Sequence, residues 1–268
     1  MAYNKFEHFQ LEKKLANELR ASTAEQRRTL YGKVYNVLFS TFPELANKHE
    51  ASLEERMGWQ LKLVQKLYNK DKIFMEIGAG DCILSKAVAP HFKKIVAYEV
   101  ADSIPFIEGK PENFELKIFN GVDMHEKEGA VDIIYSNQVF EHLHLDDTDP
   151  LLKQYHNFLS KDGKLVLITP HRLTGPHDIS RDFTKDAEGF HMKEYTYKEL
   201  RDQLKANSFT KIKGYIGYSK WGYFAVPMWM LILIEKTCDS MPKFLKKKLK
   251  TSKLAFNFFG IKMIATKK

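Results

Sequence analysis

Hydrophobic positions follow two different patterns along the chain. In residues 1–70, apolar side chains recur at steps of three and four between charged positions, which predicts amphipathic helices. From residue 72 onward, short continuous apolar runs alternate with helical stretches. The runs are 73–77, 95–99, 114–119, 131–135, 165–169, 212–218 and 261–265. Helices are expected between them at 83–91, 149–159 and 197–206.

This alternation of strands and helices predicts an α/β fold. Continuous apolar runs are typical of strands that are covered on both sides, so we expect a mostly parallel, seven-stranded sheet with helices on both faces. Residues 1–70 form a helical N-terminal extension, and residues 71–268 form the main domain. Ligands of such sheets bind beyond the carboxyl ends of the strands, and site residues are therefore sought directly after each run.

The segment 220–259 interrupts the alternation and is expected to be a helical insertion before the last strand. It contains the apolar string WGYFAVPMWMLILI, followed by a lysine-rich stretch. The apolar run 223–234 is shorter than the roughly 20 residues needed to span a bilayer. Packing against the sheet is the simplest interpretation, and a helix that lies in a membrane interface is the alternative.

The positive charge of the protein is concentrated at the C-terminus. The formal net charge is +8, but residues 241–268 contain nine lysines and no acid, which leaves residues 1–240 at −1. A nucleic-acid partner is therefore not expected for the body of the protein. The lysines form either a solvated face or a contact with an anionic membrane surface.

Composition indicates a folded cytoplasmic protein. The apolar share is 44% and the charged share 28%, as in ordinary globular domains. Two cysteines exclude a disulfide scaffold, and the N-terminal string MAYNKFEHFQLEKK is too polar for a secretory signal. The membrane alternative for the lysines would place the protein peripherally at the inner membrane face.

The first apolar run ends in a glycine turn of the kind that binds nucleotides. Glu76, Gly78 and Gly80 lie between this strand and the next helix, and the glycines let the backbone approach a ligand closely. An acid at this position suits a ligand with an ammonium group better than one with a pyrophosphate. Glu99 ends the second run 21 residues after Gly78, a spacing typical of an acid that binds ribose hydroxyls.

With these residues, the chain resembles the class I S-adenosylmethionine-dependent methyltransferases, which have a Rossmann-like fold. Later landmarks follow in the same order, at 119–121, 136–143 and 161–163. The strings SNQVFEHLH, ITPHRLTGPHDIS and GFHMKEYTYKEL are similar to a bacterial branch linked to the biosynthesis of capsules and other surface polysaccharides. The resemblance therefore implies S-adenosyl-L-methionine as the cofactor and a glycan precursor as the acceptor.

The resemblance also implies which residues bind the cofactor. Glu76, Gly78 and Gly80 would line its methionine half. Glu99 would hold the ribose, and Val100 would lie beside the adenine. Asn120, Gly121 and Val122 would edge the adenine ring, and Ser136 and Asn137 would lie near the sulfonium. Cys82 stands where the family has a third glycine, and it is expected to lie inside the following helix.

Seven of the ten histidines fall between residues 125 and 191, and they suggest two ways of activating an acceptor. In the first, a histidine acts as general base, with His171 or His177 preferred and His142 as a further candidate. In the second, Glu141, His142 and His191 hold a divalent metal such as Mg²⁺ or Mn²⁺. The alternative to both is that Glu141 and His142 have a structural role only, in which they cap the start of a helix and pack against their neighbours.

The metal hypothesis follows a second resemblance. Methyltransferases that act on small-RNA 3′ ends and on ubiquinone precursors carry Glu-x-x-Glu-His at this position, and the RNA enzymes add a later histidine. In this sequence Gln138 replaces the first glutamate, which removes one anionic ligand.

Polar residues after the fifth run predict a small polar acceptor. Arg172 and Arg181 would hold an anionic group, and Asp178 would bind a sugar hydroxyl or orient a histidine. We expect an O-methyltransferase that acts on a sugar hydroxyl or phosphate-type oxygen of a nucleotide-activated or lipid-linked glycan precursor. The alternatives are a metal-dependent RNA ribose methyltransferase and a non-catalytic scaffold that binds the cofactor.

Overall fold

The computed structural model describes residues 3–45, 53–102, 109–218, 222–242, 244–246, 248 and 259–268, without the side chains of 53–56 and 218. Much of the lysine-rich half of the predicted insertion, residues 249–258, thus lies outside the described residues. Four of the nine C-terminal lysines, at 243, 247, 250 and 253, are likewise outside the described residues.

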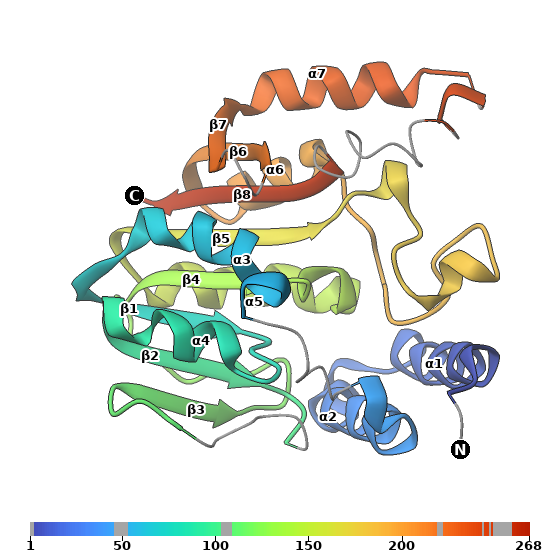
Figure 1. The fold of residues 1–268 in the computed structure, drawn as a ribbon, viewed down its shortest axis with the longest axis horizontal. Helices are drawn as coiled ribbons and strands as arrows, with labels where there is room; N and C mark the ends of the chain where they lie inside the picture. The colour runs from blue at the N-terminus through green and yellow to red at the C-terminus, as the bar shows by residue number, and fades with distance from the viewer. Residues whose placement is uncertain are drawn as a thin grey trace.

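A single eight-stranded sheet forms the centre of the described structure (Figure 1). Its strands are β1 (Asn69–Ile77), β2 (Phe92–Glu99), β3 (Phe114–Ile118), β4 (Val131–Asn137), β5 (Leu159–Pro170), β6 (Phe209–Tyr218), β7 (Gly222–Pro227) and β8 (Gly260–Lys267). The order is β3-β2-β1-β4-β5-β8-β6-β7. The first five strands pair in parallel, whereas β8 is antiparallel to both β5 and β6. The α/β class and the mostly parallel sheet are confirmed.

The expected number of seven strands is wrong, because the predicted insertion contributes a strand of its own. Strand β7 pairs antiparallel with β6 and forms the edge of the sheet. In the sequence it merges with the apolar run that follows, and its last residue, Pro227, directly precedes the next helix. Proline lacks the N–H that a continuing strand would use, so the strand ends there and a helix begins.

Seven α-helices with bounds inside the described segments accompany the sheet, and residues 244–246 are helical as well. They are α1 (Lys5–Arg20), α2 (Ala24–Thr41), α3 (Leu53–Val64), α4 (Ile83–Val88), α5 (Leu145–Phe158), α6 (Tyr197–Ala206) and α7 (Met228–Asp239). Helix α5 begins four residues before the predicted start, because the ring of His144 accepts a hydrogen bond from the N–H of Asp146. Helices α1, α2 and α3 take up most of the described part of residues 1–70, although β1 already begins at Asn69, and the division into an extension and a main domain stays a prediction.

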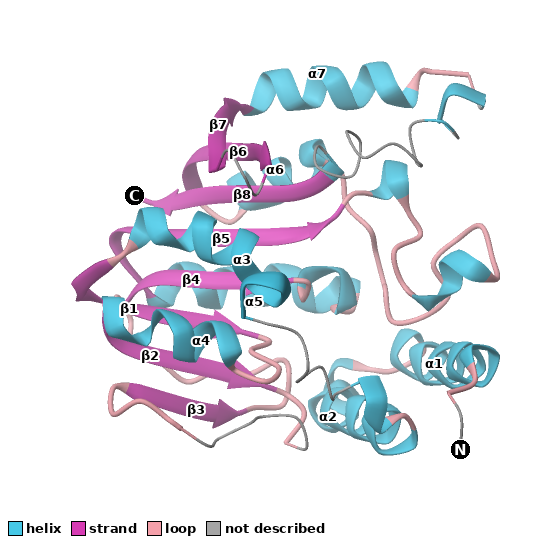
Figure 2. Ribbon diagram, in the orientation of Figure 1, coloured by secondary structure: helices cyan, strands magenta, loops and turns pink. Residues whose placement is uncertain are grey.

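Helices cover both faces of the sheet (Figure 2). Helices α3 and α4 pack on one face through Leu63 and Leu84. On the other face, α5, α6 and α7 pack through Leu151, Leu200 and Leu231. None of the helices in the described part of the chain is both long enough and apolar enough to cross a bilayer.

Helices α1 and α2 lie beyond the carboxyl ends of the parallel strands (Figure 1). Thr23 begins α2 with a capping box, in which its side chain and that of Gln26 each accept a backbone N–H. Leu19 and Val34 join the two helices in a core that also includes Phe190 from the loop before α6. This pair of helices covers the edge of the sheet where a ligand is expected.

The sheet also fixes where the ligand should bind. Strand β1 pairs with β2 on one side and with β4 on the other, so the chain connections run in opposite directions from β1. A crevice opens at such a switch point, outside the carboxyl ends of the two strands. The loops that follow Ile77 and Asn137 therefore border the expected site.

Candidate active site

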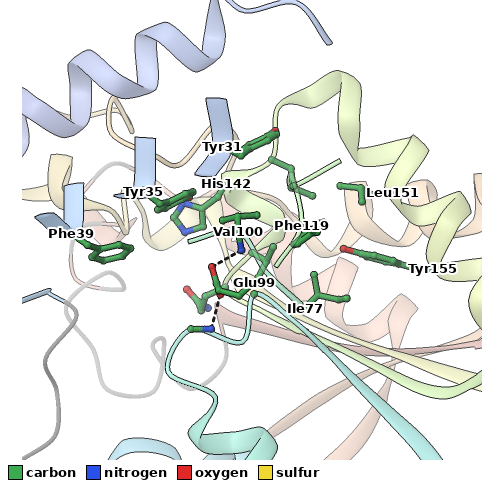
Figure 3. A pocket seen from close by; sticks show the side chains of 16 residues that line it. Tyr31, Tyr35, Phe39, Ile77, Glu99, Val100, Phe119, His142, Leu151 and Tyr155 are labelled. Carbon is green, nitrogen blue, oxygen red and sulfur yellow. Dashed lines mark hydrogen bonds between the residues drawn. The ribbon is translucent and has the colours of Figure 1, made fainter. Parts of the chain in front are cut away.

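A pocket of about 200 Å³ lies at this switch point, between the sheet edge and α2 (Figure 3). It is mostly apolar, with one carboxylate and one imidazole among its side chains. The lining residues are Tyr31, Tyr35, Phe39, Ile77, Gly78, Gly80, Glu99, Val100, Phe119, Gly121, Gln138, Val139, His142, Leu143, Leu151 and Tyr155. Five of the ten predicted cofactor-binding residues are in this set: Gly78, Gly80, Glu99, Val100 and Gly121.

The carboxylate of Glu99 is held at the end of β2 by three backbone N–H groups. Its Oε2 accepts from Gly80 at 2.7 Å. Its Oε1 accepts from Val100 at 2.8 Å and from Ala101 at 3.1 Å. Burial raises the pKa of Glu99, and these hydrogen bonds act in the opposite direction by stabilising the charged form. The carboxylate is thus positioned before any ligand arrives.

Glycines bring the walls of the pocket close together at two points. A Cβ on Gly78 would lie 2.4 Å from Cγ2 of Val139, and the residue has a φ of +67°. A Cβ on Gly121 would lie 2.7 Å from the ring of Tyr31, with a φ of +84°. Neither position accepts a side chain. At Gly80, by contrast, a Cβ would meet nothing within 4 Å, so open space borders the turn.

The expected position of Cys82 inside a helix is wrong. The residue precedes α4 as its N-cap and has a φ of +58°. Glycine adopts this left-handed conformation freely, whereas other residues do so at a cost of about 1 kcal/mol. Cys82 therefore keeps the backbone shape of a glycine turn without being glycine.

Sequence analysis missed the aromatic wall of the pocket. Tyr31, Tyr35 and Phe39 project from α2 at four-residue steps, which places them on one side of the helix. Figure 3 shows the Tyr35 ring beside that of His142, and the ring centroids are 6.2 Å apart. The four-residue spacing was visible in the sequence. It does not distinguish a pocket wall from an ordinary packed helix face.

Five predicted cofactor residues are not among the lining residues: Asn120, Val122, Ser136, Asn137 and Glu76. Asn120 uses its side-chain oxygen to accept the N–H groups of Val122 and Asp123, and it thereby shapes its own loop. Ser136 and Asn137 each keep a buried oxygen without a hydrogen-bond partner in the described structure.

Glu76 is the fifth of these residues, and it lies buried beneath the pocket. The hydroxyl of Ser85 donates to its carboxylate at 2.5 Å. Burial raises the pKa of Glu76 to about 8. Its predicted contact with an ammonium group remains a prediction.

A second polar group adjoins the pocket through His142. Carboxylate and imidazole atoms of Glu141, His142 and His191 all lie within 4.8 Å of one another. The residues come from the short helix after β4 and from the loop before α6. We call these three residues the Glu-His-His cluster. The structure thus brings together the three residues that the sequence predicted as metal ligands.

Hydrogen bonds orient each member of the Glu-His-His cluster. The Nδ1–H of His142 donates to the carbonyl of Phe190 at 3.2 Å, and His191 Nδ1 donates to Glu194 at 2.9 Å. Glu141 Oε2 accepts from the hydroxyl of Thr169 at 2.9 Å. Its other carboxylate oxygen, Oε1, is buried and has no partner among the described residues.

Burial sets the protonation states in the Glu-His-His cluster. Burial, and after it the charge of His191, lowers the pKa of His142 to about 3, so this imidazole is neutral at physiological pH. Burial raises the pKa of Glu141 to about 7. Burial acts to lower the pKa of His191 as well, but the hydrogen bond to Glu194 and nearby carboxylates outweigh it and raise the pKa.

The two histidines preferred as general bases lie elsewhere. Neither His171 nor His177 is among the residues that line the pocket. His171 is fully buried, and it accepts from the N–H of Leu173 at Nδ1 while its Nε2–H donates to Glu235 at 2.9 Å. The Nε2 of His177 is 2.8 Å from the hydroxyl of Thr174. Both rings hydrogen-bond to neighbouring residues, and their catalytic role remains a prediction.

The three predicted acceptor-binding residues also lie outside the pocket lining. Arg172 is exposed and pairs with Glu199 at 3.3 Å. Arg181 is exposed on the same loop. Asp178 is buried and accepts the N–H groups of Ser180 and Gly189, so it holds the loop together. Their contact with an acceptor remains a prediction.

Comparison with known families places the chain among methyltransferases. A family described as a methyltransferase domain matches residues 49–213. This match includes the glycine turn, Glu99 and the Glu-His-His cluster. No curated protein sequence matches the chain.

Solved structures with the same fold include several methyltransferases. Phosphoethanolamine N-methyltransferase 1 of Haemonchus contortus, solved with phosphoethanolamine and S-adenosylhomocysteine, has a TM-score of 0.60 at 16% identity. The match covers 91% of this chain and 50% of that one, so the chain spans half of that protein's length. A possible histamine N-methyltransferase of Thermotoga maritima has a TM-score of 0.55 at 15% identity, and the match covers 86% of this chain and 98% of that one. A SAM-dependent methyltransferase of Archaeoglobus fulgidus has a TM-score of 0.54 at 14% identity, and the match covers 87% of this chain and 99% of that one.

Proposed function

The chain belongs to the methyltransferase-domain family, and from this premise we propose that it transfers a methyl group from S-adenosylmethionine to an oxygen of a small polar acceptor. The observation that carries the proposal is the pairing of two features in one pocket. Glu99, a carboxylate fixed for ribose hydroxyls, lies on one wall, and the imidazole of His142 lines the same pocket.

The pocket offers a polar group for the ribose of the cofactor and apolar walls for its adenine ring. Glu99 would accept the ribose hydroxyls, and the open space beside Gly80 leaves room for a ligand at the turn. Val100, Phe119 and Gly121 give the flat apolar walls that suit an adenine ring. When bound, S-adenosylmethionine supplies an activated methyl group as the electrophile.

His142 is the residue that we assign to the acceptor. Because its Nδ1–H donates to the Phe190 carbonyl and the ring is neutral, Nε2 carries a free lone pair. This nitrogen can accept a hydrogen bond from an acceptor hydroxyl, hold it in one orientation, and take up its proton once methylation has made the hydroxyl strongly acidic. Glu141 and His191 lie next to it and keep the surroundings polar.

We further propose that the acceptor is a sugar hydroxyl or phosphate-type oxygen of a nucleotide-activated or lipid-linked precursor of a capsule or other surface glycan. The polar Glu-His-His cluster beside an otherwise apolar pocket supports a polar acceptor over an aromatic one. RNA ribose methylation remains the alternative enzyme activity, and a cofactor-binding scaffold is the non-catalytic one. The cytoplasmic location expected from the sequence stays a prediction.

Incubation with isotopically labelled S-adenosylmethionine and a panel of acceptors tests this function. The panel contains nucleotide sugars, polyprenyl-phosphate sugars, phosphoethanolamine and single-stranded RNA. We expect label in a sugar or phosphate oxygen, located by mass spectrometry. Label in RNA ribose or on an amine nitrogen would contradict the acceptor class. If no acceptor is labelled although the cofactor binds tightly, the scaffold alternative holds.

Glu99→Gln should weaken cofactor binding by roughly 10- to 150-fold, since a hydrogen bond to a charged group contributes about 1.5–3 kcal/mol. Calorimetric titration with S-adenosylhomocysteine measures the effect. The matched control is Glu126→Gln, which removes a carboxylate that binds Tyr98 and Lys117 outside the pocket lining. An unchanged dissociation constant for Glu99→Gln would refute the ribose assignment.

A second form of the mechanism places a divalent metal in the Glu-His-His cluster. The donor set fits such an ion, because Glu141 Oε1 is buried without a described partner and the Nδ1 atoms of both histidines are engaged elsewhere, which directs Nε2 to the metal. A bound Mg²⁺ or Mn²⁺ would lower the pKa of an acceptor hydroxyl.

Titration of chelator-treated protein with Mn²⁺ tests the metal independently of activity. We expect one binding event in calorimetry, lost or weakened about 10-fold or more in His191→Ala. His156→Ala is the control, because this ring packs against Phe209 outside the cluster. If chelated protein binds no metal and keeps its full rate, the metal is excluded and His142 acts alone.

A further inference from the structure

The described structure exposes an apolar surface that the proposed chemistry does not use. Twelve large apolar side chains are exposed in the described residues, and seven of them lie between residues 224 and 245. Four belong to α7: Trp229, Met230, Leu233 and Ile234. Trp229 is 65% exposed and Leu233 57%. Scattered single residues of this kind are ordinary on a surface, but a concentration in one short segment indicates a contact.

These four residues form one continuous side of α7, which we call the outer face. They recur at positions i, i+1, i+4 and i+5, the spacing of a single helix face. The opposite side is also apolar, since Met228, Leu231 and Ile232 are buried against the fold. A helix side as apolar as this is normally covered, yet the outer face of α7 is exposed.

The inner side of α7 is firmly fixed, so its outer face is presented by a rigid element. Glu235 is buried and accepts hydrogen bonds from the His171 ring and from the N–H of Tyr197. Leu231 packs onto β6 so closely that a Cβ on Gly214 would lie 2.0 Å from it. Figure 1 shows α7 along the outer edge of the molecule beside β7, where Phe224 is 63% exposed.

The positive charge of the segment after α7 indicates what kind of surface binds the outer face. The chain that follows α7, residues 241–268, has nine lysines and no acidic residue. Among its described residues, Phe244 is exposed and is followed by Lys246, which pairs with Asp239 at 3.2 Å, and by the exposed Lys248, whereas Lys262 is buried. Apolar and aromatic side chains followed by lysines match a surface that is apolar inside and negative outside, as an anionic bilayer is. A second copy of the chain would bring the same lysines of both copies together, which disfavours a symmetric dimer through this face.

We propose that the outer face of α7, with the exposed Phe224 before it and the exposed Phe244 after it in the chain, docks the protein onto an anionic lipid bilayer. The helix lies parallel to the membrane plane, with Trp229 and Leu233 inserted at the level of the headgroups. Lys246 and Lys248, two described lysines after α7, contact the lipid phosphates. Docking would bring the enzyme to the surface where a lipid-linked acceptor resides, although the contact itself requires neither cofactor nor acceptor.

Vesicle co-sedimentation of the full chain tests this docking, without cofactor or acceptor present. We expect binding to vesicles of phosphatidylcholine mixed with phosphatidylglycerol, and little binding to phosphatidylcholine alone. Trp229→Ser with Leu233→Ser should lower partitioning by about 10-fold or more. The matched control is Ile118→Ser with Leu145→Ser, which removes two apolar side chains of similar exposure, 49% and 53%, from other elements. The control should bind as the unaltered chain does.

A second arm tests the charge. Lys246→Gln with Lys248→Gln, or added salt, should also weaken binding to the anionic vesicles. Equal partitioning of the Trp229/Leu233 variant and the unaltered chain would overturn the proposal. So would a lipid-free dimer that this variant converts to monomer, because the face would then bind a second copy. Since no methyl transfer is measured, failure of docking and failure of the proposed activity are separate results.

Discussion

Replacing Arg27 by methionine is expected to lower the free energy of unfolding by about 3–5 kcal/mol, because it leaves a buried carboxylate without its cation. The Arg27 guanidinium is 1% exposed and binds Asp147 through two hydrogen bonds, of 2.6 and 2.8 Å. A third hydrogen bond joins it to the carbonyl of Ser22 at 2.7 Å. The carboxylate of Asp147 is 4% exposed, so water does not replace the lost partner.

The neighbouring residue provides the control for this prediction. Arg28 lies on the same helix and also pairs with an acid, Asp123, at 2.8 Å, but its side chain is 45% exposed. Surface pairs of this kind contribute about 0–1 kcal/mol, so Arg28→Met should change stability far less. Asp147→Leu combined with Arg27→Met should restore part of the loss, since no charge remains buried. Urea unfolding followed by circular dichroism measures all three variants.

The same contact links stability to the pocket. Tyr31 donates from its hydroxyl to Asp147 at 2.9 Å, and its ring packs against Gly121 in the pocket wall. Removing the Arg27 guanidinium should therefore loosen α2 and weaken cofactor binding as well. A loss of stability equal to that of Arg28→Met would show that the buried pair does not hold α2 in place.

Local sequence patterns predicted the parallel strands, two of the antiparallel strands and one edge of the site. The apolar runs mark seven of the eight strands, because strands that are covered on both faces have continuous hydrophobic sequence. The glycine turn and Glu99 could be placed because parallel strands end at the same edge, and their residues must then lie together. Strand β7 was missed because its apolar residues continue without a visible break into α7.

The rest of the site depends on contacts between distant segments, which no local pattern encodes. Arg20 of α1 binds the carbonyls of Glu188 and Gly189, and Phe190 donates its N–H to Glu12. These contacts position the loop that delivers His191 to the Glu-His-His cluster. His171, by contrast, follows a strand as a catalytic residue would, yet its ring is used to fix α7. Sequence position alone made His171 and His191 equally good candidates for the site. Only their side-chain partners distinguish the two.

His142→Gln is expected to lower kcat by about 10²- to 10⁴-fold, the range of a residue that handles the acceptor proton. Glutamine can still accept a hydrogen bond through its amide oxygen, but this oxygen is far less basic than the imidazole Nε2 and does not take up the acceptor proton. Cofactor affinity should change much less, because Glu99 and the glycine turn remain in place. Rapid-quench turnover and calorimetry with S-adenosylhomocysteine measure the two effects separately.

His125→Gln is the matched control, because this histidine is exposed and outside the pocket lining. It should leave both constants unchanged. If His142→Gln weakened cofactor binding as much as it lowered kcat, the imidazole would serve the cofactor pocket instead of the acceptor. If kcat stayed within about 3-fold of the unaltered enzyme, acceptor activation would have to come from another residue. Restoration of the rate of the variant by Mn²⁺ alone would assign the activation to the metal and reduce His142 to one of its ligands.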